Sequence, residues 1–181
     1  MLKRITLALL IIFTCTAVLC AMGDRIDRSK IKNAIAVAGN PAAADKGAMV
    51  FNDLDGNPVP VLDIIGQKAV ILNFFASWCP PCREEMPSLD KLNQYIIDKD
   101  VILLAVNLQE SPEHIKSFME ESGYTFRVVF DPQDILTKKF KISGIPTTYL
   151  IDKNGKVRKK IVGSIDWMDE TMLKLVNEIS R

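Results

Sequence analysis

An apolar segment that runs directly into two closely spaced cysteines constrains this 181-residue chain more than any other feature. Ala69–Phe75 reads AVILNFF and has the length and character of a strand that is covered on both faces of a sheet. Cys79 and Cys82 follow it, and Leu89 and Leu92 then recur at helical spacing. This order predicts a buried strand that leads through the cysteine pair into an amphipathic helix.

The surrounding segments continue the alternation of strands and helices. The turn-forming run Asp53–Asn57 predicts an N-terminal hairpin, and Ser111 followed by Pro112 is typical of a helix start. Thr147–Ile151 and Val157–Val162 flank a turn that joins antiparallel strands. The pattern predicts an α/β fold with a mixed central sheet flanked by helices. The other expected elements are strands at 101–106 and 126–130, a short helix at 132–141, and a final helix marked by Met168, Met172, Val176 and Ile179.

The first 23 residues have the pattern of a targeting segment. Lys3 and Arg4 precede an uncharged apolar run, residues 5–22, as in a secretory signal. Cleavage after Gly23, retention of the run as a membrane anchor and lipid attachment at Cys20 are all open. Each alternative places the following residues outside the cytoplasm, in the periplasm or at the outer face of the cytoplasmic membrane.

The remainder of the chain divides into a linker and one domain. Residues 24–47 are small and polar, as in a linker, and residues 48–181 have the size of a single domain. We therefore expect a signal peptide or membrane anchor in 1–23, a linker in 24–47 and one folded domain in 48–181.

Charge and cysteine counts limit the classes of function. The formal net charge is +1, whereas nucleic-acid-binding proteins are usually strongly basic, so no nucleic-acid partner is expected. Loss of residues 1–23 would remove two of the four cysteines and leave only Cys79 and Cys82. With His114 they are too few for a structural zinc site, which takes four ligands. We expect neither a metal nor a cofactor.

The two remaining cysteines have the spacing of a redox-active dithiol. Cys79 would lie at a helix N-terminus, where free N–H groups and the helix dipole favour a thiolate, so it is the predicted nucleophile. Cys82, one turn further, would be more shielded and would resolve a mixed disulfide. A static structural disulfide is the alternative that spacing alone leaves open.

Two separate motifs resemble the thioredoxin superfamily, specifically its TlpA/ResA/CcmG-like exported thiol-disulfide oxidoreductases. They are residues 73–87, NFFASWCPPCREEMP, and residues 144–152, GIPTTYLID. The resemblance covers Ala48 to Arg181 and implies a thioredoxin-like fold in which the segment 109–123 is an inserted helix. It also implies that the Ile145–Pro146 bond is cis and faces the dithiol. The backbone there, together with Trp78, would bind an extended substrate segment.

Two glutamates are candidates for a role beside the dithiol. Asn73 stands where cytosolic thioredoxins have a buried Asp, so that proton acceptor is absent. Glu85, three residues after Cys82, is expected to exchange protons with it, and Glu110 matches a second acid of the family. The single histidine, His114, is assigned no role in the mechanism.

The resemblance implies an enzyme that reduces protein disulfides outside the cytoplasm. Its substrates would be exported proteins, with apocytochrome c as the first candidate, and a membrane-embedded thiol carrier would supply electrons. A monomer is expected. The alternatives are a general disulfide reductase or oxidant for other exported proteins, and a copper-binding chaperone on the same fold. Copper proteins of that kind usually carry CxxxC and a downstream His, whereas this chain has CxxC and no His after His114.

Overall fold

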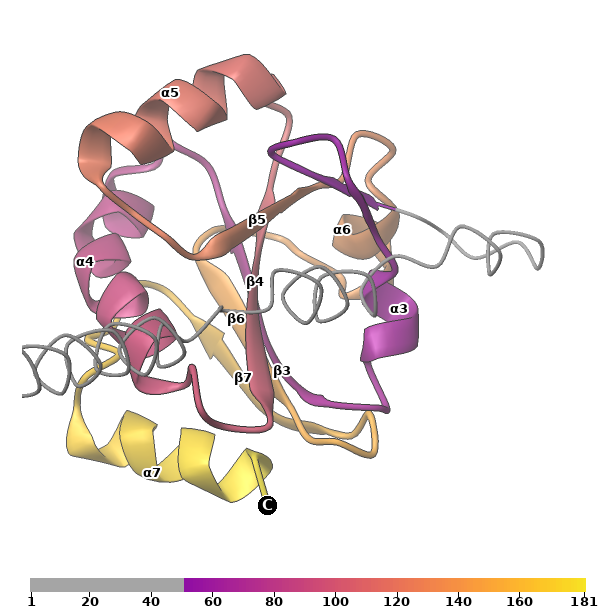
Figure 1. The fold of residues 1–181 in the computed structure, drawn as a ribbon, viewed down its shortest axis with the longest axis vertical. Helices are drawn as coiled ribbons and strands as arrows, with labels where there is room; N and C mark the ends of the chain where they lie inside the picture. The colour runs from indigo at the N-terminus through magenta and orange to yellow at the C-terminus, as the bar shows by residue number, and fades with distance from the viewer. Residues whose placement is uncertain (1–50) are drawn as a thin grey trace, which may run out of the picture. The chain divides into compact units, whose positions relative to one another are not determined.

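One mixed sheet lies at the centre of residues 51–181, the part of the chain that the computed structural model describes (Figure 1). The predictions for residues 1–23 and 24–47 lie outside this part. Seven strands build the sheet, namely β1 (Phe51–Asp53), β2 (Pro58–Val59), β3 (Ala69–Phe75), β4 (Val101–Asn107), β5 (Arg127–Phe130), β6 (Thr147–Ile151) and β7 (Val157–Val162).

The strand order is β2-β1-β5-β4-β3-β6-β7, which places β3 and β4 in the interior of the sheet. β3 pairs in parallel with β4, and β4 pairs in parallel with β5. β6 is antiparallel to β3 on one side, and β1 is antiparallel to β5 on the other. The predicted mixed sheet is confirmed, as is the N-terminal hairpin, because β1 and β2 pair across the Asp53–Asn57 turn.

Helices cover both faces of this sheet. Figure 1 shows α4 and α7 on one side of it and α3 and α6 on the other. The helices are α3 (Val61–Ile64), α4 (Pro80–Tyr95), α5 (Pro112–Ser122), α6 (Ile135–Lys139) and α7 (Glu170–Ile179). None of the helices within residues 51–181 has the length and apolar character that crossing a bilayer requires.

The alternation of side chains along the strands divides the interior into two hydrophobic cores. Successive residues of a strand point to opposite faces, so Ile71 and Phe75 of β3 enter one core while Leu72 and Phe74 enter the other. The first core also holds buried side chains of α4, α5 and α7, and the second holds Val61 of α3 together with a residue of α6. Because both faces are covered, the whole of β3 is buried, as its unbroken apolar run predicts.

Two short helices differ from the sequence prediction. The helix expected at 132–141 spans only Ile135–Lys139, because Asp134 has a left-handed backbone (φ 56°) that no residue within a right-handed helix can have. The Asp131 carboxylate accepts hydrogen bonds from the backbone N–H groups of Ile135 (2.7 Å) and Thr137 (2.8 Å) and so anchors this start. The four-residue helix α3 was not predicted, since it is too short to show a periodic pattern.

Candidate active site

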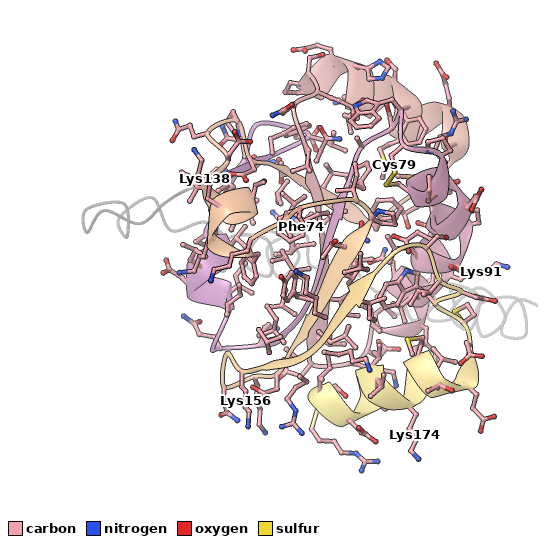
Figure 2. All side chains as sticks on the ribbon, turned by 180° about the vertical axis from the view of Figure 1, so that it is seen from behind. Phe74, Cys79, Lys91, Lys138, Lys156 and Lys174 are labelled. Atoms are coloured by element: carbon pink, nitrogen blue, oxygen red, sulfur yellow. A yellow bond between two sulfur atoms is a disulfide. The ribbon has the colours of Figure 1, made fainter. Side chains whose placement is uncertain are left out.

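A disulfide bond joins Cys79 and Cys82 where β3 passes into α4 (Figure 2). Cys79 has an extended backbone and occupies the N-cap position of α4, with two prolines in the first turn. Pro80 and Pro81 have no N–H groups, and the backbone N–H of Cys82 lies 3.3 Å from the Cys79 sulfur. The first sulfur is therefore held at the helix N-terminus, where an anionic sulfur is stabilised.

The two cysteines differ in their access to solvent. Cys79 keeps 4% of its surface exposed, whereas Cys82 is completely buried. Trp78 next to Cys79 is 67% exposed, which is unusual for so large an apolar side chain. A disulfide of another protein can therefore approach Cys79 across an apolar surface, and it cannot reach Cys82.

A segment that is distant in sequence, Ile145–Pro146, lies against the disulfide. The Ile145–Pro146 peptide bond is cis, and the Ile145 carbonyl oxygen lies 3.8 Å from the Cys79 sulfur. The Pro146 carbonyl already accepts a hydrogen bond from the Gly163 N–H (2.9 Å). The Ile145 carbonyl is therefore the acceptor that faces the reactive sulfur.

Glu85 lies one helical turn beyond Cys82, and only 2% of its surface is exposed. Its Oε1 accepts a hydrogen bond from the Asn73 side-chain amide (2.8 Å). Its Oε2 accepts from the backbone N–H of Ile165 (3.4 Å) and from the indole N–H of Trp167 (3.3 Å). Burial raises the pKa of Glu85 to about 7, although these hydrogen bonds act in the opposite direction. A carboxyl group with this pKa can both accept and donate a proton near neutral pH.

Glu110 is hydrogen-bonded to the loop that carries the cysteine pair. The Ser77 backbone N–H (2.8 Å) and the Asn107 side-chain amide (2.7 Å) donate to its Oε2, and the Ser77 hydroxyl donates to its Oε1 (2.5 Å). Ser77 is two residues before Cys79. The structure thus brings both predicted acids to the site region, Glu85 as a buried residue of α4 and Glu110 through its hydrogen bonds to Ser77.

Several residues of the site were missed by sequence reasoning. His114 Nε2 lies 3.0 Å from the Ser77 hydroxyl oxygen and 3.6 Å from Glu110 Oε1, so the single histidine is part of the rim of the site. The four-residue spacing of Glu110 and His114 was a usable signal for their contact. Asn107 offered a sequence signal as well, because it is a polar residue directly after the apolar run 101–106. Trp167 had no such signal, since it contacts Glu85 across 82 residues of chain.

Within residues 51–181, no group of three or more His, Cys, Asp or Glu side chains is arranged to hold a metal ion. A disulfide at a strand–helix junction, opposed by a cis-proline bond on a mixed sheet, defines a thiol-disulfide oxidoreductase of thioredoxin-like fold.

Comparison with known proteins agrees with this class. The model of the family described as Redoxin matches residues 36–175, and the chain belongs to this family. Thiol-disulfide oxidoreductase ResA of Geobacillus thermodenitrificans (strain NG80-2) is 39% identical over 147 residues, which are 81% of this chain and 82% of that protein. ResA of Bacillus subtilis (strain 168) is 31% identical over 155 residues, 86% of this chain and 83% of that protein.

Solved structures show the same fold. A putative thiol:disulfide interchange protein DsbE from Chlorobium tepidum superposes with a TM-score of 0.65 at 29% identity, covering 74% of this chain and 93% of that one. StoA from Bacillus subtilis has a TM-score of 0.61 at 25% identity, covering 70% and 94%. The predicted membership of the TlpA/ResA/CcmG-like branch of the thioredoxin superfamily is confirmed, and so is the enzyme class.

Proposed function

We propose that this protein reduces disulfide bonds of exported proteins, with Cys79 as nucleophile and Cys82 as resolving cysteine. The unequal burial of the two sulfurs is the observation that carries the proposal. A substrate disulfide reaches only Cys79, and the intermediate that forms there lies next to a thiol that no other molecule can reach. This arrangement favours release of the substrate over a lasting mixed disulfide.

The reaction begins from the reduced dithiol. The Cys79 thiolate attacks one sulfur of the substrate disulfide, a new Cys79–substrate S–S bond forms, and the other substrate sulfur leaves as a thiolate. The Cys82 thiolate then attacks the Cys79 sulfur and releases the second substrate sulfur. Two electrons have passed to the substrate, and the protein is left with the Cys79–Cys82 disulfide seen in the structure.

Glu85 provides the proton exchange that the second step requires. Cys82 must lose its proton before it attacks, and no solvent reaches its sulfur. Glu85 lies one turn along the same helix, and its pKa of about 7 lets it accept this proton and return one to a leaving thiolate. In this proposal Glu110 keeps the Ser77–Cys79 loop in place through its hydrogen bonds to Ser77 and has no direct part in proton transfer.

Substrate binding is assigned to the surface around Cys79. The exposed ring of Trp78 provides apolar contact, and the Ile145 carbonyl accepts a hydrogen bond from an extended substrate segment. Pro146 has no N–H and leaves the segment free to approach the sulfur. These contacts involve mainly substrate backbone, so the surface suits polypeptides of varied sequence.

The setting of this reaction follows from the N-terminal pattern and the family resemblance. We propose that residues 5–22 export the domain or tether it to the outer face of the cytoplasmic membrane. A membrane-embedded thiol carrier would reduce the Cys79–Cys82 disulfide again. Apocytochrome c, whose two cysteines must be reduced before haem attachment, is the first candidate substrate, and the protein would act as a monomer.

Trapping of the mixed disulfide tests the proposal. In Cys82→Ser the first step proceeds and the second cannot, so exported proteins should accumulate in complexes that thiol reagents release. A double variant with Cys79→Ser and Cys82→Ser is the matched control and should trap nothing. If Cys82→Ser also traps nothing, the reductase proposal is wrong. If the trapped partners gain disulfides in cells that contain the protein and lose them in cells without it, the protein is an oxidant.

A further inference from the structure

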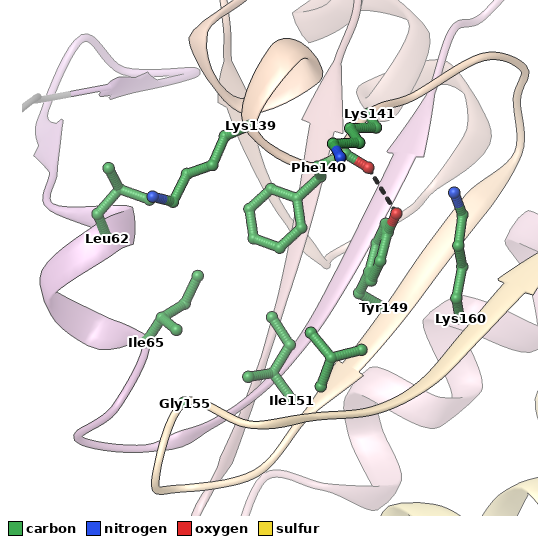
Figure 3. A pocket seen from close by; sticks show the side chains of 10 residues that line it. Leu62, Ile65, Lys139, Phe140, Lys141, Tyr149, Ile151, Gly155 and Lys160 are labelled. Atoms are coloured by element: carbon green, nitrogen blue, oxygen red, sulfur yellow. Dashed lines mark hydrogen bonds between the residues drawn. The ribbon is translucent and has the colours of Figure 1, made fainter.

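A cleft of about 630 Å³ opens on the α3 and α6 side of the sheet (Figure 3). Apolar side chains form most of its floor and walls, among them Leu62 of α3, Phe140 after α6 and Ile151 of β6. Its volume lies within the range of ligand-binding clefts, roughly 300–1,000 Å³. The Cys79–Cys82 disulfide does not line it.

The cleft exists because short helices leave part of this face of the sheet uncovered. Tyr149 and Ile151 of β6 point to the same face as Val157 and Lys160 of β7, with which they are paired. The opposite face is covered by the 16 residues of α4 and the 10 of α7, whereas α3 has four residues and α6 has five. One consequence is that Val157 remains 46% exposed at the edge of the cleft.

Three lysines supply the charge of the cleft. Lys139 of α6, Lys141 and Lys160 line it, and no Asp or Glu of residues 51–181 does. Figure 3 shows Lys139 and Lys160 on opposite sides of the Phe140 and Tyr149 rings. The Lys160 ammonium lies 5.3 Å from the centre of the Tyr149 ring. The ion pairs found within residues 51–181 involve other basic side chains, so these three positive charges are uncompensated by a carboxylate.

The floor offers almost no hydrogen-bonding group to a polar ligand. Its one hydroxyl, that of Tyr149, donates to the Phe140 carbonyl at 2.5 Å and is therefore already engaged. A sugar or a nucleoside on this floor would lose hydrogen bonds to water, and the lysines could replace only those it accepts. A ligand with an apolar body and a single anionic head matches both the floor and the lysines.

We propose that this cleft binds a fatty acid, with the acyl chain on the apolar floor and the carboxylate among Lys139, Lys141 and Lys160. Burial of the chain supplies the attraction, and the lysines select the charge of the head group. The site is independent of the dithiol chemistry, so it stands or falls separately from the proposed reductase function.

Photo-crosslinking of the full chain in phosphatidylcholine vesicles tests this proposal. A dodecanoate that carries a diazirine near the end of its chain should label peptides containing Leu62 and Phe140, whereas dodecanol with the same diazirine should label them much less. A triple variant with Lys139→Gln, Lys141→Gln and Lys160→Gln should reduce the labelling by dodecanoate roughly tenfold. Lys91→Gln with Lys174→Gln is the control, since these lysines lie on α4 and α7 (Figure 2), and it should leave the labelling unchanged.

Reduction of insulin disulfides by the same variants shows that they are folded, and we expect it to be unchanged in all of them. Equal labelling by dodecanol and dodecanoate would show a merely apolar cleft and overturn the proposal. Equal loss in the Lys91 and Lys174 control would show non-specific attraction and overturn it as well. If phosphatidylglycerol in the vesicles abolishes labelling by dodecanoate, the occupant is a membrane lipid and the assignment to a free fatty acid is wrong.

Discussion

Two glutamates flank the cysteine pair, and their surroundings differ in a way that separates two functions. Each carboxylate accepts three hydrogen bonds from neutral donors. Glu85 is a buried residue of α4 whose carboxylate contacts the indole N–H of Trp167, and burial raises its pKa to about 7. Glu110 lies at the rim, where the 61% exposed side chain of His114 is its neighbour. We infer that burial, rather than the number of hydrogen bonds, suits Glu85 to the proton exchange proposed for it.

The largest expected difference between the two acids is in the rate of disulfide reduction. Glu85→Gln removes the proton acceptor, and we expect exchange at pH 8 to slow about 100-fold, at the lower end of the range for acid–base catalysis. The wild-type rate should rise through pH 7 as Glu85 ionises, and the variant should lack this inflection. Single-turnover reduction of a protein disulfide between pH 5.5 and 8.5 measures both.

Glu84→Gln is the control, because Glu84 is the exposed neighbour on the same helix. It should keep the wild-type profile. An inflection near pH 7 that persists in Glu85→Gln would assign the proton transfer to another group.

The same burial predicts that the oxidised protein loses stability as pH rises. The folded pKa of Glu85, about 7, is above its ordinary value of 4.5, so between these pH values the folded state binds more protons than the unfolded state. The contribution of Glu85 is therefore full below about pH 4.5 and is lost as pH rises through 7, a difference of about 3 kcal/mol.

Urea denaturation at pH 5 and pH 8.5, with the disulfide intact, measures this loss. In Glu85→Gln the loss should be absent, whereas Glu84→Gln should retain it. Equal stability of the wild type at both pH values would show that folding does not raise the pKa of Glu85.

Substitution of Glu110 should have a smaller effect, and it should change the stability of the fold more than the rate of disulfide reduction. Glu110→Gln places an amide N–H₂ against groups that donate, and one of the Ser77 or Asn107 donors loses its acceptor. This should lower the free energy of unfolding by about 2 kcal/mol and slow disulfide reduction only a few-fold. Glu113→Gln, at an exposed position in the first turn of α5, is the control: it should leave the rate unchanged and lower the free energy of unfolding by less than about 1 kcal/mol, through loss of a charge that the helix dipole favours. A loss of rate as large as that of Glu85→Gln would show that both acids carry protons.

The smallest effect on stability is expected from substitution of His114. His114→Ala removes a largely exposed side chain whose polar contacts within residues 51–181 are with Ser77 and Glu110. The free energy of unfolding should change by less than about 0.5 kcal/mol in urea denaturation at pH 7. A larger loss would mean that the imidazole, and not Glu110, holds the loop.

Most of the fold could be predicted from the spacing of apolar residues and from the turn and capping residues between them. β3 spans the predicted residues because its unbroken apolar run is buried on both faces. β6 and β7 do so because the turn between them fixes where each strand ends. The start of α5 at Ser111 was equally visible, and the Ser111 hydroxyl accepts the His114 N–H as an N-cap should. α6 was predicted too long because the left-handed backbone of Asp134 leaves no trace in apolar spacing.

The site could be predicted only where its residues are neighbours in sequence. The spacing of Cys79 and Cys82 and the position of Glu85 one turn later are local, so a single stretch of sequence reveals them. The contact of Trp167 with Glu85 depends on how a loop that is distant in sequence packs against α4. The lysine-lined cleft likewise depends on how segments that are distant in sequence pack on the sheet. Such long-range contacts follow from three-dimensional packing and have no local pattern.

Both tryptophans of the chain lie at the site, and each is placed to report on it optically. Trp167 is completely buried with its indole N–H on Glu85, so its emission should change when that carboxyl group gains or loses a proton. Trp78 is exposed beside Cys79, where a soluble quencher reaches it freely until a substrate covers it. The unmodified protein thus carries two intrinsic fluorophores that separate the ionisation of its interior from the occupancy of its surface.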